Sequence, residues 1–111
     1  MTWITYISYF FGGILLGNAI PHFVSGMMGR AFQTPFAHPS GKGLSSALVN
    51  IEWGTFNIIV GYVLVFHVGI FDLRNTWDAI TFGAGFFLIG TLSARLFGPF
   101  HGGDTKDSRE S

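Results

Sequence analysis

The sequence predicts an all-α membrane protein that crosses the bilayer three times. Charged residues make up only 11% of the chain, hydrophobic residues make up 49%, and the mean hydropathy is +0.46. A soluble domain carries about 25% charged residues, so this chain has too little polar surface to face water on all sides. The apolar residues also gather into three stretches of about 20 residues, the length that spans a hydrocarbon core of about 30 Å.

The three expected spans cover residues 3–23, 46–71 and 77–97, and together they make residues 1–101 one transmembrane domain. Backbone polar groups in lipid must be paired within their own segment, which makes helix the expected state of each span. Each apolar run opens with a tryptophan, a residue that prefers the membrane–water boundary. These residues are Trp3, Trp53 and Trp77.

Polar, proline and glycine residues separate the spans. Pro21 is expected either to kink the first helix or to end it, which leaves residues 23–32 as a continuation or as a segment at the interface. Residues 30–45 hold two prolines and two glycines and are expected to form a loop. Asn75 is expected to cap the third helix, with Asp78 as the acid of a capping box. Residues 102–111 are polar and are expected to form a disordered tail.

The basic residues predict the orientation. With three spans, the first loop and the C-terminus share one side, which holds five of the six basic residues, while the other side holds only Arg74. The five are Arg30, Lys42, Arg95, Lys106 and Arg109. Positive charge concentrates on the cytoplasmic side of membrane proteins. We therefore expect the N-terminus outside and the C-terminus in the cytoplasm.

Small residues form stripes that predict close helix packing. On the second span, Asn50, Gly54, Asn57 and Gly61 share one helical face. Small residues let membrane helices approach closely, either within the chain or between copies of it. The expected packing glycines are Gly13, Gly17, Gly54, Gly61, Gly83 and Gly90.

Polar residues at membrane depth define a candidate binding cluster in the cytoplasmic half. Ionisable groups at this depth are costly and commonly functional. The candidates are Asn18, His22, Glu52, Asn57 and Arg95. Such a cluster could bind an anion, relay a proton or hold a lipid headgroup. Alternatively, Glu52 lies at headgroup level and Arg95 extends to the interface. We expect Asn57, the deepest of the five, to form an interhelical hydrogen bond.

Two segments on the same predicted side share a pattern. Arg30-Ala-Phe32 followed by Pro35-Phe36-Ala-His38 resembles Arg95-Leu-Phe97 followed by Pro99-Phe100-His101. Both segments could form a paired basic and aromatic surface for lipid headgroups or a partner. The alternative is that each is a helix exit, with Arg at the phosphates and Pro ending the helix.

The stretch Pro21-His22-Phe23, the pair Pro35-Phe36 and a glycine-bearing helix around Glu52 and Gly61 loosely resemble small DoxX-like bacterial membrane proteins. The resemblance covers about half of the chain. Those proteins have four helices where this sequence predicts three, so no function is carried over from the resemblance.

Other chemistry finds little support in the sequence. There is no cysteine and the formal net charge is zero, which argues against thiol chemistry and a nucleic-acid partner. The four histidines do not show the spacing of a metal or haem site, and neither a metal nor another cofactor is expected. No nucleophile–base arrangement or phosphate-binding loop is visible.

These observations predict a small structural or accessory subunit of the bacterial inner membrane. It is expected to pack into a homo-oligomer or a larger membrane complex. An oligomeric transporter or channel with its polar site in the cytoplasmic half is the first alternative. A membrane redox or enzyme subunit is the second, so enzymatic activity is left open.

Overall fold

The computed structural model describes residues 2–105 and contains three long helices, as predicted. Helix α1 covers Trp3–Met27, α2 covers Ala47–Phe66 and α3 covers Thr76–His101. Between α1 and α2, strands β1 (Phe32–Gln33) and β2 (Leu44–Ser45) pair in antiparallel fashion, with Phe32 opposite Ser45. All three helices are long and apolar enough to cross a membrane.

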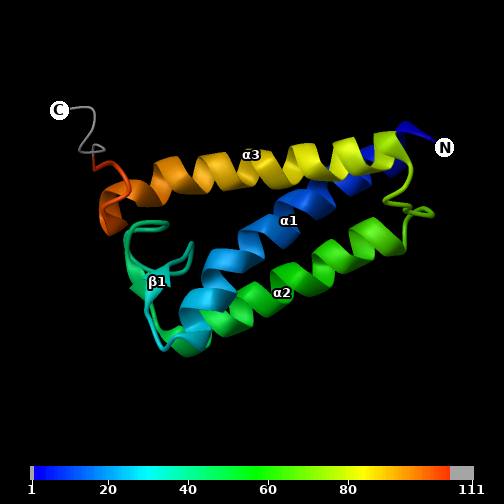
Figure 1. Cartoon of the computed structure of the whole chain (residues 1–111). Coiled ribbons are helices and arrows are strands. Elements are labelled where there is room, and N and C mark those ends of the chain that lie inside the picture. The colour runs from blue at the N-terminus through cyan, green and yellow to red at the C-terminus, as the bar shows by residue number, and fades with distance from the viewer. Residues whose placement is uncertain (1, 106–111) are drawn as a thin grey trace.

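Helix α1 lies in the centre of the fold. Both α2 and α3 pack along α1, whereas they scarcely contact each other. The Cα atoms extend over 45 × 37 × 23 Å, so the molecule is broad and thin. Figure 1 shows the start of α1 and the turn between α2 and α3 at one end, and the β1–β2 hairpin and the end of α3 at the other. The hairpin end therefore gathers segments from all three helices.

The helix bounds differ from the expected spans at three places. Helix α1 continues through Pro21 to Met27, because its last turn packs on α2. The helices approach so closely there that a Cβ added at Gly26 would lie 2.7 Å from the backbone oxygen of Ala47. A proline in a membrane helix is tolerated when its neighbours support the backbone. Helix α2 ends earlier than expected, at Phe66. Helix α3 continues through Pro99 to His101, so the proline does not end it.

Caps explain where the helices start and stop. The Asn75 side chain accepts hydrogen bonds from the backbone N–H groups of Trp77 and Asp78, which confirms its predicted role. The capping-box role predicted for Asp78 is wrong. Its carboxylate accepts a hydrogen bond from the Asp72 N–H at 3.1 Å, so it stabilises the turn before the helix and does not bind the cap residue Asn75. Gly102, with φ of +77°, ends α3 in the left-handed conformation that glycine adopts without strain. Of the predicted tail, residues 106–111 lie outside the described residues.

Glycines allow α1 to approach both neighbours closely. A Cβ at Gly13 would overlap the Phe82 backbone carbonyl of α3, and one at Gly17 would lie 2.5 Å from Ile89. A Cβ at Gly54 would lie 2.9 Å from the Phe23 backbone nitrogen, and one at Gly61 would lie 2.7 Å from Leu16. Four of the six expected packing glycines therefore lie where two helices meet.

The remaining two expected packing glycines lie on α3 and have no neighbour from another element among residues 2–105. Apart from the adjacent backbone of α3 itself, no described atom lies within 4 Å of a Cβ added at Gly83 or Gly90. They do not join helices within this chain, because α3 contacts α1 through a different side. On that side, a Cβ at Gly85 would overlap the Phe10 backbone oxygen of α1. The sequence pattern identified Gly83 and Gly90 but not Gly85.

Candidate functional site

Three polar contacts join α1 to α2 along their shared seam. The Ser8 hydroxyl donates to the Leu64 carbonyl at 2.5 Å. Farther along, Asn18 Nδ2 donates to Asn57 Oδ1 at 3.2 Å, as expected for Asn57. Closest to the hairpin, His22 Nδ1 and Asn50 Oδ1 lie 2.8 Å apart. Buried polar groups are costly unless they are paired, so these contacts fix how the two helices face each other.

Asn50 connects this seam to the hairpin. Its side chain is fully buried, and Nδ2 lies 3.3 Å from the Phe32 carbonyl and 3.1 Å from the Ser45 carbonyl. Because Nδ2 faces these acceptors, Oδ1 faces His22 and can only accept a hydrogen bond there. Nδ1 of His22 therefore carries a proton and donates it. The Asn50 amide thus links α1, α2 and both strands through hydrogen bonds.

The hairpin also reaches across to the end of α3. Gln33 Oε1 lies 2.7 Å from His101 Nε2 and can only accept, so His101 donates. The Phe32 ring stacks on the His101 imidazole, with centroids 5.0 Å apart, and meets Phe97 at 4.9 Å. The two similar segments of the sequence therefore contact each other. Their residues form one aromatic cluster at the hairpin end of the molecule.

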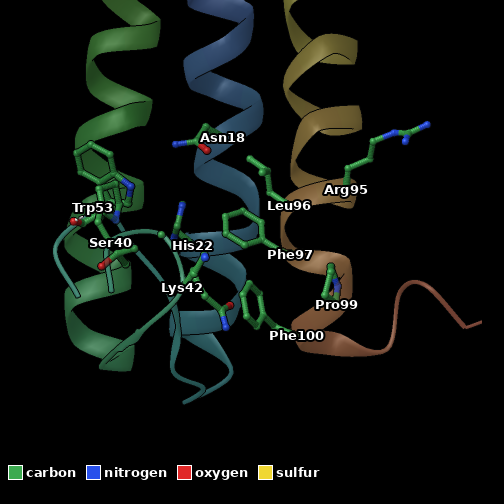
Figure 2. Close-up of a pocket in the computed structure, with 14 residues that line it drawn as sticks. Asn18, His22, Ser40, Lys42, Trp53, Arg95, Leu96, Phe97, Pro99 and Phe100 are labelled. Atoms are coloured by element: carbon green, nitrogen blue, oxygen red, sulfur yellow. Dashed lines mark hydrogen bonds between the residues drawn. The ribbon is translucent and has the colours of Figure 1, made fainter. Parts of the chain in front are cut away.

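A cavity of about 510 Å³ lies beside this cluster, between α2 on one side and the end of α3 on the other. Figure 2 shows Asn18 and His22 on the central helix, Trp53 on α2, and Phe97 and Phe100 on α3. All five of these residues line the cavity. The volume falls within the range of about 300–1,000 Å³ typical of small-molecule sites. Both apolar and polar residues line the cavity, with aromatic side chains from α2 and α3 and polar side chains from α1, the hairpin and α3.

Positive charge and an unpaired donor characterise the cavity. Lys42 and Arg95 are among its lining residues, and no Asp or Glu of residues 2–105 is. Figure 2 shows the Arg95 side chain directed away from the central helix, which leaves Lys42 as the cation of the loop side. The indole N–H of Trp53 is buried and has no hydrogen-bond partner among residues 2–105. The site therefore presents donors and a cation without an acidic partner in its lining.

The predicted binding residues are divided between three places. Asn18, His22 and Arg95 line the cavity. Asn57 lies in the seam, hydrogen-bonded to Asn18 and to the Trp53 carbonyl. Glu52 is exposed and does not line the cavity, because it leaves α2 on the side opposite the face that packs on α1. His22 accordingly pairs with Asn50 and not with Glu52.

Sequence reasoning missed several residues that build this site. The sequence pattern assigns Asn50 to a packing face, Lys42 to the basic side of the membrane and Gln33 to the first loop, but none of the three to the predicted binding cluster. Gln33 is 4% exposed although it lies between two helices in the chain. No local pattern marks Gln33 and Lys42, because the folding of the hairpin toward α3 brings them to the cavity. Trp53, which the sequence predicts at the membrane interface, lines the cavity.

Among residues 2–105, no group of three or more His, Cys, Asp or Glu side chains could hold a metal ion. Comparisons with protein-family models, with curated proteins and with solved structures found no match for this chain. The candidate site is therefore interpreted from its own geometry.

Proposed function

We propose that this protein is a small structural subunit of a bacterial inner membrane that assembles with a second copy of itself through α3. The observation that carries the proposal is the open space at Gly83 and Gly90. Within the described helices, every other glycine lies where a Cβ would meet another atom within 4 Å. A glycine inside a helix costs about 1 kcal/mol relative to alanine, so it is expected where close approach repays that cost.

The surface around these glycines is suited to a second helix. At 100° per residue, Gly83, Gly90 and Ala94 fall within an arc of about 40° on α3. Two grooves, of about 470 and 380 Å³, share Phe86, Gly90 and Ala94 as walls. Only Asp78, Gly85 and Gly98 of α3 are buried within the chain. A two-fold axis along the bilayer normal would place this face against its own copy, so one interface completes the assembly.

The proposal includes an orientation with the N-terminus outside and the C-terminus in the cytoplasm. Arg30 and Lys42 lie in the segment between α1 and α2, and Arg95 lies in the last turns of α3. The hydrogen bond between Gln33 and His101 supports the placement of both segments at one membrane face. The bias of basic residues toward that face supports its assignment to the cytoplasm.

Energy transfer between labelled copies in lipid vesicles tests the assembly, measured as the protein is diluted with lipid. The wild type is expected to dimerise. In the double variant Gly83→Leu/Gly90→Leu, overpacking of about 1–3 kcal/mol is expected to weaken dimerisation roughly tenfold or more. The matched control is Ala84→Leu, an exposed position about 100° from Gly83. A monomeric wild type, or equal effects of the control and the double variant, would contradict the proposal.

The transporter alternative is tested in the same vesicles. The seam residues Asn18 and Asn57 hydrogen-bond to each other within one chain. The cavity toward the other end of α1 is lined mainly by apolar residues, among them Ile4, Phe11 and Leu64. This arrangement favours a structural role for the seam. Passage of ions or small solutes by the purified protein would instead favour transport.

A further inference from the structure

We propose that the cavity at the hairpin end binds an anionic amphiphile, a molecule with an apolar tail and a head group that carries a phosphate or a carboxylate. Its supports are the walls of the cavity, its unpaired donors and its place at the boundary between helices and loop. The cavity shares Arg95 and Phe97 with the grooves on the α3 face proposed for assembly, but Gly83 and Gly90 do not line it.

The walls fit an apolar tail. Trp53 of α2 stands on one side of the cavity, and Leu96, Phe97 and Phe100 of α3 stand on the other. Residues of both α2 and α3 line the cavity, although these two helices scarcely contact each other. An apolar tail can therefore lie between Trp53 and Leu96.

The polar side of the cavity fits an acidic head group. Lys42 is exposed and forms no ion pair with the carboxylates of the described residues. The buried Trp53 N–H lacks an acceptor among the same residues. A phosphate or carboxylate has several acceptor oxygens, so it can pair with the Lys42 ammonium and also offer an acceptor on the side of Trp53. Within the part of the chain that the structure describes, no acidic residue lines the cavity to repel that charge.

The location fits an amphiphile better than a soluble anion. The lining residues of α3 run from Arg95 to Phe100, at the end of a helix apolar enough to span a membrane. On the loop side, Lys42 lies in the segment between β1 and β2. The cavity therefore spans the boundary between the apolar helices and the polar loop. A ligand there places its tail and head in the environments that each prefers.

Fluorescence of Trp53 provides a direct test. Trp3 and Trp77 are exposed and lie at the opposite end of the molecule, so the variant Trp3→Phe/Trp77→Phe leaves Trp53 as a single reporter. This protein is reconstituted in phosphatidylcholine vesicles and titrated with dibromostearate, whose bromines quench tryptophan, or with its uncharged methyl ester. Quenching by the acid is expected at roughly tenfold or more lower concentration, as one charge-assisted hydrogen bond would give.

Variants locate the charge that is responsible. Lys42→Gln is expected to abolish the preference for the acid over the ester, whereas Arg74→Gln, which removes a cation at the other end, is expected to preserve it. Vesicles that contain brominated phosphatidylglycerol distinguish the two sources of the ligand. Quenching by this lipid identifies a bilayer phospholipid as an occupant, and quenching by the acid alone identifies a free amphiphilic acid. Equal quenching by acid and ester, or a preference that survives Lys42→Gln, would overturn the proposal.

Discussion

Replacing Asn50 with leucine is expected to destabilise this protein more than the same replacement at Asn57. Both side chains are at most 1% exposed and both hydrogen-bond to α1. The two replacements differ in which polar groups lose a hydrogen-bond partner. Without Asn50, the Nδ1–H of His22 and the carbonyls of Phe32 and Ser45 lose a partner. Without Asn57, the principal loss is the contact with the half-buried Asn18.

The difference can be estimated from these contacts. An interhelical hydrogen bond in a membrane contributes on average about 0.6 kcal/mol and at most about 1.7 kcal/mol. Each buried polar group left without a partner costs about 1–3 kcal/mol. Asn57→Leu is therefore expected to reduce the free energy of unfolding by about 0.5–2 kcal/mol. Asn50→Leu is expected to reduce it by about 3–5 kcal/mol, since two or three groups are affected.

Reversible unfolding in mixed micelles with increasing sodium dodecyl sulfate measures both free energies. Hydrogen–deuterium exchange adds a local measurement, because Asn50→Leu is expected to accelerate exchange in residues 32–45 while Asn57→Leu leaves it unchanged. Equal destabilisation by the two variants would refute the reasoning. So would unchanged exchange of the hairpin in Asn50→Leu, since the hairpin would then be held without this amide.

Two further predictions concern packing and orientation. Gly85→Leu is expected to reduce the free energy of unfolding by about 1–3 kcal/mol in the same assay. The reason is that a Cβ at Gly85 would overlap the Phe10 backbone, which cannot move aside as a side chain could. An effect no larger than that of Ala84→Leu would contradict this prediction. Reporters active on only one side of the membrane, fused to each terminus in turn, are expected to place the N-terminus outside and the C-terminus in the cytoplasm, and a cytoplasmic N-terminus would contradict the proposed orientation.

Much of the candidate site depends on contacts that the sequence does not encode locally. The i, i+4 spacing of Asn18 and His22 placed both on one face of α1, and both line the cavity. Their partners could not be assigned in the same way, because Asn50 and Asn57 lie on another helix whose rotation is set by packing. Glu52 shows that a predicted depth in the membrane does not identify a site residue. The sequence predicts Glu52 at a similar depth to His22, but its direction from α2 keeps it outside the cavity.

The sequence by itself determined that three helices form and which of their residues are small enough for close packing. This follows from local physics, since backbone groups in lipid must pair within their segment and hydropathy is a sum over neighbours in the chain. Only the tertiary structure decided that α1 is central, that Gly13 and Gly17 meet α3 while Gly83 and Gly90 meet nothing, and that the hairpin folds back to His101. These outcomes depend on which surfaces fit together across the fold, and periodicity along one helix does not specify the partner of a face.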